Sequence, residues 1–219
     1  MANNNSTSGA LLTRKTLITH YNNPNGNKNI SRNGLQGNTQ GSRIPINLAQ
    51  QNNKICVNSD VNKSDYCPLE AKLGHTLIMV DFTSRWERPQ IDWVKGRIFG
   101  DALISSTPPY HRISYLKIDN TPPHSQKYVY SKCRFKTGTK TRFEGDKVNS
   151  KCEGSDFINT IYKTWRSQIN EVENSFFPKN EDAEQSLIYE YLVHVLREYS
   201  ADFGSDYQSR ELIIVSDLM

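Results

Sequence analysis

Apolar residues gather in runs along the second half of the chain, and the stretch Thr76–Arg85 holds the most continuous one. It reads T-L-I-M-V-D-F-T-S-R, and the absence of polar alternation over its first residues predicts a strand buried on both faces. Asp81 follows where this strand should end, with Thr83 and Ser84 close behind it. Because loops at the carboxyl ends of such strands carry ligands, Asp81 is a candidate site residue, although Asp, Thr and Ser also cap helices.

Later apolar patterns predict further strands and helices. Strands are expected at Arg112–Asp119, at Lys127–Phe135 and at Glu211–Met219, and helices at Gln90–Ile104, at Phe157–Val172 with Ser155 or Asp156 as the cap, and at Leu187–Tyr199. The link through Thr121-Pro122-Pro123 is too short for a crossover, so Lys127–Phe135 should pair antiparallel at the edge of the sheet. The predicted fold class is therefore α/β, with a mostly parallel sheet and one antiparallel edge strand.

The chain divides into three parts by composition. Residues 1–54 are rich in Asn, Gly, Ser, Thr and Gln, and offer too little apolar surface to offset the entropy of ordering, which predicts a disordered tail. Residues 55–72 are expected to form an irregular arm, and residues 73–219 the folded domain.

Charge and cysteine content narrow the classes of function. The net charge of +4 is mildly basic and scattered, so nucleic-acid binding has little support, although the loop Lys132–Lys151 gathers basic residues beside aromatic ones, namely Arg134, Lys136, Lys140, Arg142 and Lys147 with Phe135 and Phe143. The four cysteines form no C-x2-C pair, and we interpret them as free thiols. Without a signal peptide or a long apolar span, the sequence predicts a cytoplasmic protein.

Three separate pieces resemble the von Willebrand factor type A domain. Asp81-Phe82-Thr83-Ser84-Arg85 resembles that family's D-x-S-x-S motif, and Ser186-Leu187-Ile188-Tyr189-Glu190-Tyr191-Leu192 is similar to its T-P-I-x-E-A-L. Val215-Ser216-Asp217 is similar to the T/S-D-G that ends its fourth strand. The resemblance covers residues 73–219 and implies a three-layer, Rossmann-like fold that serves as a non-enzymatic module for protein–protein interaction in an assembly.

The resemblance also implies a metal-ion-dependent adhesion site. Asp81, Thr83, Ser186 and Asp217 would hold the ion directly or through water, and a shell of hard oxygen atoms favours Mg²⁺. In adhesive members of the family, a carboxylate of the partner protein completes the shell.

Two positions depart from the family pattern. Arg85 stands where a second serine is expected, and its guanidinium would repel a cation or form an ion pair with Asp81. Leu218 replaces the glycine of the third motif. The alternative to a metal site is therefore a degenerate domain whose Asp81 and Asp217 are held by hydrogen bonds or by Arg85.

A domain of this family continues beyond its fourth strand, whereas the sequence stops there. The last strand would then have an unpaired apolar edge, so we expect a truncated domain or one completed by another chain.

The main enzymatic alternative is a metal-dependent nuclease. Such sites gather three or four acids at strand ends, and Asp81, Asp119 and Asp217 are the candidates here. A nucleophilic pair of Cys133 with His111, His124 or His194 has no local signature to support it.

Overall fold

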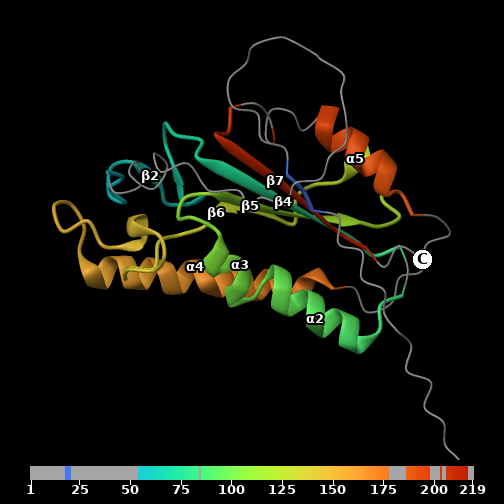
Figure 1. The fold of residues 1–219 in the computed structure, drawn as a ribbon, viewed down its shortest axis with the longest axis horizontal. Helices are drawn as coiled ribbons and strands as arrows, with labels where there is room; N and C mark the ends of the chain where they lie inside the picture. Colours follow the sequence, from blue (N-terminus) through green and yellow to red (C-terminus); the bar gives the residue numbers. More distant parts are fainter. Residues whose placement is uncertain are drawn as a thin grey trace, which may run out of the picture.

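The computed structural model describes residues 54–83, 85–177, 186–197, 203 and 206–216, together with the backbone of 18–20. The main sheet has the strand order β1-β7-β4-β5-β6 and consists of β1 (Ile18–His20), β4 (Gly74–Asp81), β5 (Arg112–Ile118), β6 (Tyr130–Cys133) and β7 (Ser209–Val215). The helices are α2 (Arg88–Ile98), α3 (Asp101–Ser106), α4 (Ser155–Phe176) and α5 (Ile188–Arg197), with short 3-10 helices η1 (Pro123–Ser125) and η2 (Glu144–Asp146). Figure 1 shows α2, α3 and α4 on one face of the sheet and α5 on the other.

The centre of the sheet is parallel, as predicted. β4 lies between β5 and β7 and runs parallel to both, with Val80 opposite Lys117 on one side and Val215 on the other. β6 pairs antiparallel with β5, which confirms the predicted antiparallel edge strand. The fold is therefore mixed α/β with a mostly parallel sheet.

Every residue of β4 is buried, because its two faces belong to two separate apolar clusters. Ile78 and Val80 pack toward α2 and α4, where Trp165 is completely buried. Leu77 and Met79 point the other way, toward Tyr191 and Val195 of α5, since successive side chains of a strand alternate between faces. Burial of each such side chain stabilises the fold by about 1.5–3 kcal/mol.

The prediction of one continuous helix over Gln90–Ile104 is wrong, because the structure has two helices there, α2 and α3. Gly100 lies between them in an extended conformation with φ −75° and ψ 173°. A Cβ atom at this position would lie 2.2 Å from the carbonyl oxygen of Gly96, so glycine allows the close approach at the junction. The start of α4 also differs from the prediction, because its N-cap is Gly154 rather than Ser155 or Asp156.

The interpretation of the cysteines as free thiols is wrong. The predicted irregular arm contains a short hairpin of β2 (Val61–Asn62) and β3 (Cys67–Pro68), and disulfides join Cys67 to Cys133 and Cys56 to Cys152. The Cα atoms of the two pairs are 5.0 Å and 6.0 Å apart, within the usual range for disulfides. Spacings of 66 and 96 residues form no local motif, and only the fold brings these sulfurs together.

The arm also covers the outer edge of β6. The backbone N–H of Cys133 donates a hydrogen bond of 2.8 Å to the carbonyl oxygen of Asp65. Val57, Val61 and Tyr66 of the arm are buried in the cluster between the sheet and α4. The arm is therefore an integral part of the folded structure.

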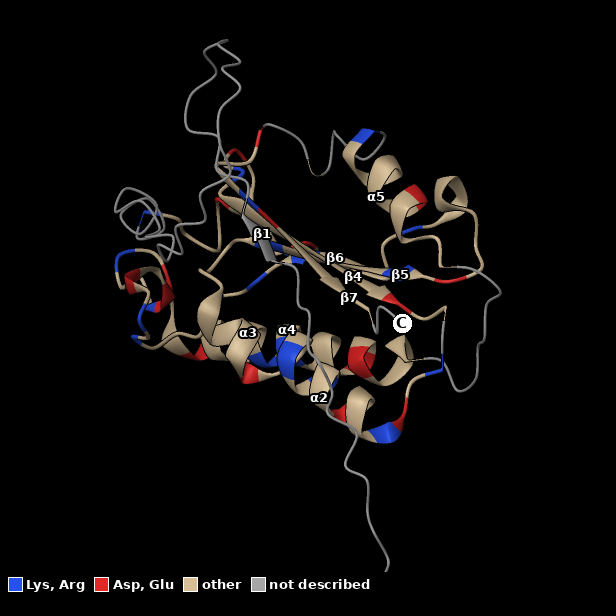
Figure 2. Cartoon of the chain, turned by 45° about the vertical axis from the view of Figure 1, so that its right-hand side comes forward, with Lys and Arg blue, Asp and Glu red and all other residues tan. Residues whose placement is uncertain are grey.

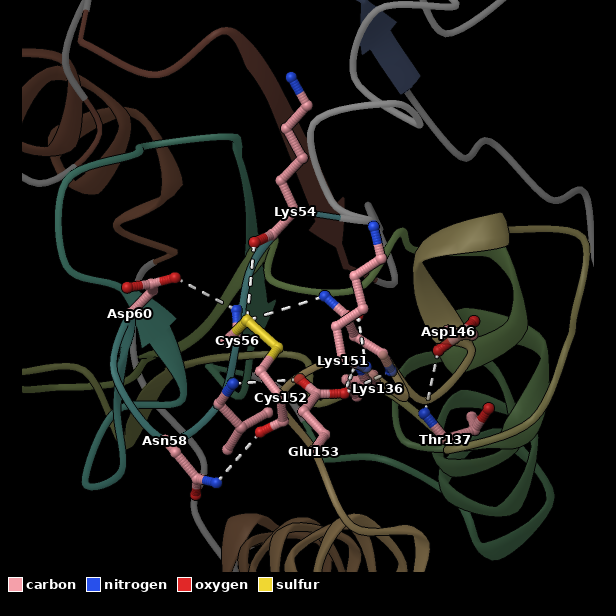
Figure 3. Close-up of polar contacts among 12 residues, drawn as sticks. Lys54, Cys56, Asn58, Asp60, Lys136, Thr137, Asp146, Lys151, Cys152 and Glu153 are labelled. Carbon is pink, nitrogen blue, oxygen red and sulfur yellow. Dashed lines mark hydrogen bonds and ion pairs between the residues drawn. A yellow bond between two sulfur atoms is a disulfide. The ribbon is translucent and has the colours of Figure 1, made fainter.

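Two buried ion pairs lie beside the arm, and Figure 3 draws the side chains of one of them, Lys136 and Glu153. Nζ of Lys136 is 2.5 Å from Oε2 of Glu153, Arg134 pairs with Asp146, and all four side chains are at most 1% exposed. Oε1 of Glu153 also accepts a hydrogen bond of 3.0 Å from the backbone N–H of Val57.

The two buried ion pairs reduce the number of exposed cations in the basic loop Lys132–Lys151. Arg134 and Lys136 are neutralised inside the protein, whereas Lys140, Arg142 and Lys147 stay exposed. Fewer cations of the loop are therefore available to a nucleic-acid partner than the sequence suggested.

The outer edge of β7 is paired over part of its length. β1 runs antiparallel to it, with Ile18 opposite Ile213 and His20 opposite Glu211. The expectation of an unpaired last strand is thus corrected at these positions, because a segment from the predicted tail pairs with it. The rest of the tail, apart from Lys54, lies outside the described residues.

Candidate functional site

Asp81 lies at the carboxyl end of β4, and its carboxylate collects hydroxyl groups from three parts of the chain. Oδ1 accepts hydrogen bonds from the backbone N–H of Thr83 at 3.0 Å and from its hydroxyl at 2.5 Å. Oδ2 accepts hydrogen bonds from the hydroxyls of Ser186 at 3.0 Å and Ser216 at 2.9 Å. We call Asp81, Thr83, Ser186 and Ser216 the hydroxyl cluster.

Sheet topology explains why these groups meet. β4 and β7 are parallel neighbours, so Asp81 and Ser216 lie side by side at the same edge of the sheet. Ser186 comes just before α5, whose first turn is closed by the hydrogen bond from Tyr191 N–H to the carbonyl oxygen of Leu187. Thr83 reaches back to Asp81 in a tight turn of the kind that Asp side chains favour.

Neighbouring contacts fix the turn that follows Asp81. The indole N–H of Trp86 donates a hydrogen bond of 2.8 Å to the carbonyl oxygen of Asp81, and the backbone N–H of Phe82 donates one of 2.8 Å to Ile118. The Phe82 ring is 3% exposed and makes edge contacts with Phe176 and Phe177 on the opposite face of the sheet. The backbone after Asp81 is therefore held by β5 and by the apolar cluster on the α4 face of the sheet.

The members of the hydroxyl cluster differ in their exposure to solvent. Asp81 is 2% exposed and Thr83 6%, whereas Ser216 is partly buried and Ser186 is exposed. Each oxygen of the buried carboxylate accepts two hydrogen bonds, so its charge is compensated by donors.

The structure places most of the predicted site residues. Asp81, Thr83 and Ser186 come together as the sequence analysis expected, whereas Asp217 lies outside the described residues, as do Ser84 and Leu218. Arg85 is exposed, and the ion pairs found among the described residues do not include it. Hydroxyls and one backbone N–H, rather than this guanidinium, contact the carboxylate of Asp81.

Ser216 was not among the predicted site residues. The signal for it was present in the sequence, because Ser216 occupies the hydroxyl position of the third motif, directly before Asp217. Because Val215 of β7 lies opposite Val80 of β4, the next residue, Ser216, lies beside Asp81 and donates a hydrogen bond to it.

Of the three acids proposed for a nuclease, the structure describes Asp81 and Asp119, whereas Asp217 lies outside the described residues. Asp119 follows β5 at the same edge of the sheet as Asp81, but its carboxylate accepts a hydrogen bond of 2.8 Å from the backbone N–H of Thr121. In the described part of the chain, no three His, Cys, Asp or Glu side chains gather in a group that could hold a metal ion.

The donor set of the hydroxyl cluster suits a small hard cation. One carboxylate and three hydroxyls present only oxygen atoms, and Mg²⁺ takes oxygen ligands while it keeps several waters. A hydroxyl that donates to Asp81 still has lone pairs to offer a cation. The residues present therefore fit a magnesium ion.

Comparison with known proteins adds no family. No protein-family model matches the chain, and neither curated proteins nor solved structures include a match. None of the helices in the described residues has the length and apolarity needed to cross a membrane.

Proposed function

We propose that this protein is a non-enzymatic module for protein–protein interaction, and that the hydroxyl cluster is its binding site. The observation that carries the proposal is the convergence of Asp81, Thr83, Ser186 and Ser216, from separate segments, at the carboxyl edge of the sheet. The order β7-β4-β5-β6, with β6 antiparallel, further supports a domain of the von Willebrand factor type A kind.

The proposed cofactor is Mg²⁺. Asp81, Thr83, Ser186 and Ser216 would hold it, and Asp217 would join them by analogy with the family pattern. A bound ion would supply an open coordination position for a carboxylate of the partner protein. The protein's part is to keep the oxygen donors in place, and the contacts of Trp86 and Phe82 fix the backbone that carries the carboxylate of Asp81.

The disulfides bear on where this function takes place. Stable disulfides form and persist in oxidising environments and are rare in the cytosol. Since both pairs join the arm to the folded domain, we infer that the protein works in an oxidising compartment. This inference replaces the cytoplasmic location that free thiols had suggested.

Calorimetric titration of Mg²⁺ and Mn²⁺ into the full chain tests the proposal. The wild-type protein should bind one of these ions saturably, and Asp81→Asn should abolish binding because it removes the only carboxylate of the cluster. Asp101→Asn is the matched control, since its side chain is 94% exposed and lies away from the cluster, and it should bind like the wild type.

Other outcomes contradict the proposal in different ways. A wild-type protein that binds neither ion would leave the hydroxyl cluster as a structural device that satisfies a buried carboxylate. Binding that survives Asp81→Asn would place the ion elsewhere. Circular dichroism on each variant shows whether the fold is retained.

A further inference from the structure

The turn between β2 and β3 carries a motif that the proposed function does not use. Residues 62–64 read Asn-Lys-Ser, which is the N-x-S acceptor motif for N-linked glycosylation. Asp60 stands two positions before Asn62, so the longer form of the motif, D-x-N-x-S, is also complete. The other copies of the N-x-S/T motif begin at Asn4, Asn5 and Asn29. Among the described residues, the motif therefore occurs at Asn62 alone.

The two groups that the motif requires contact each other at the surface. Oδ1 of Asn62 accepts hydrogen bonds from the hydroxyl of Ser64 at 2.8 Å and from its backbone N–H at 2.9 Å. Nδ2 of Asn62 donates a hydrogen bond of 3.3 Å to Oδ2 of Asp65. Lys63 and Ser64 are exposed, and Asn62 is partly exposed. Because Nδ2 carries two hydrogen atoms, it can bond to a sugar and still donate to Asp65.

The turn lies far from the hydroxyl cluster. Nζ of Lys63 is 5.5 Å from the ring centroid of Phe157, in the first turn of α4, whereas Phe176 at the other end of α4 contacts Phe82, next to Asp81. The helical rise separates Phe157 from Phe176 by about 28 Å along the axis. Figure 1 shows β2 and α5 toward opposite ends of the molecule, and Figure 2 shows α5 on the face of the sheet opposite α4. A large group on the turn would therefore leave the hydroxyl cluster open.

The disulfides are a second, independent observation that points to this modification. Cys67, which follows the motif closely, is paired with Cys133, and Cys56 is paired with Cys152. Such bonds form and persist in oxidising environments outside the cytosol. N-linked glycans are added on the same, non-cytosolic side of a membrane and occur on surface loops of secreted proteins. A chain that acquires these disulfides therefore passes through a compartment in which the motif can be used.

We propose that Asn62 is the acceptor of an N-linked glycan. The proposal rests on the oxidising compartment inferred above and is independent of Mg²⁺ binding. The co-substrate is an oligosaccharide on a lipid diphosphate, which an oligosaccharyltransferase of that compartment binds. Nδ2 of Asn62 forms a bond to the anomeric carbon of the first sugar while the bond from that carbon to the diphosphate oxygen breaks. The lipid diphosphate leaves, and Nδ2 loses one proton to a base of the transferase.

Mass spectrometry of the full chain, purified from the cells that make it naturally, tests the proposal. After reduction and alkylation, trypsin releases the fragment Ile55–Lys63, which contains Asn62 but not Ser64. This fragment should be heavier by the mass of an oligosaccharide, and fragmentation that preserves the glycan should locate the added mass on Asn62. Ser64→Ala, made in the same cells, should lose the oligosaccharide completely.

Ser64→Thr is the matched control, because threonine keeps the hydroxyl and the variant should stay glycosylated. A bare Asn62 in protein whose cysteines are paired would overturn the inference, as would equal glycosylation of Ser64→Ala and the wild type. Glycans found only at Asn4, Asn5 or Asn29 would overturn it as well. Free thiols in the native protein would remove the oxidising compartment on which the inference rests, whereas the Mg²⁺ titration decides the role of the hydroxyl cluster separately.

Discussion

Asp81 and Glu153 are both buried carboxylates, but the protein compensates their charges differently. Asp81 accepts hydrogen bonds from neutral hydroxyls and a backbone N–H, and no ion pair is found for it among the described residues. Glu153 pairs with the buried ammonium of Lys136 and accepts backbone N–H donors from Val57 and Asn149. Glu153 therefore has a structural role, whereas the binding role proposed for Asp81 depends on its neutral hydroxyl donors rather than on an ion pair.

Glu153→Gln should destabilise the protein by about 3–5 kcal/mol, because it leaves the ammonium of Lys136 buried without a counter-charge. Urea unfolding of wild type and variant measures the difference. Glu144→Gln is the control, since Glu144 pairs with Lys147 at the surface and its loss should leave the free energy of unfolding unchanged. Equal effects of the two substitutions would show that burial of the Lys136 pair has no energetic consequence.

His111 should make stability depend on pH. Burial, and secondarily the charge of Arg134, lower the pKa of His111 to about 4, from an ordinary value near 6.5. Between pH 4 and pH 6.5, His111 is therefore protonated in the unfolded chain but neutral in the folded protein. The contribution of His111 to stability is therefore complete above about pH 6.5 and is lost as pH falls toward 4, by about 3 kcal/mol in total.

Urea unfolding near pH 7 and near pH 4.5 checks this expectation. His111→Leu cannot bind a proton at this position, so the variant should lose less stability over the interval than the wild type does. Identical losses in the two proteins would mean that other groups, such as the buried carboxylates, account for the whole pH dependence.

At the scale of elements, the arm of residues 55–72 is stabilised by its disulfides as well as by the burial of its apolar side chains. Its hairpin strands β2 and β3 are two residues each, too short to be stable alone. The bond between Cys67 and Cys133 closes a long loop, for which chain entropy predicts about 4 kcal/mol of stabilisation. The covalent bond therefore adds to the buried contacts that hold the arm over the edge of β6.

Thiol titration and unfolding test this role together. Protein purified without reductant and then denatured should show no free thiol, and Cys67→Ala combined with Cys133→Ala should lower the free energy of unfolding by about 4 kcal/mol. Four titratable thiols in the oxidant-exposed protein, or equal stability with and without dithiothreitol, would contradict the disulfide arrangement.

The sequence predicted those elements whose signal is local. The apolar run of β4 and its end at Asp81 follow from hydrophobicity alone, and the short link before β6 predicted its antiparallel pairing. The disulfides and the burial of Lys136 could not be predicted, because their partners lie far away in the sequence. Within the site, Thr83 and Ser186 came from motif resemblance, whereas Ser216 required the register of β7 against β4.

For the whole molecule, the sheet should be more stable at its centre than at its β7 side. β4 is buried along its entire length, whereas each residue of β7 is partly exposed. Amide hydrogen exchange should therefore be slowest in β4 and faster in β7. Deletion of residues 1–20 should speed exchange in β7 alone, because β1 pairs with no other strand. Unchanged exchange in β7 after the deletion would show that β1 does not protect this edge.

The order of the four cysteines along the chain has a consequence for biosynthesis. The bonds are nested, since the first cysteine pairs with the last and the second with the third. While the chain emerges from the ribosome, Cys56 and Cys67 are the first thiols to meet, and a bond between them would be non-native. The native pairs become available only after β6 and then Cys152 have been synthesised. Delayed oxidation, or a disulfide isomerase that undoes early mispairing, should therefore raise the yield of natively paired protein.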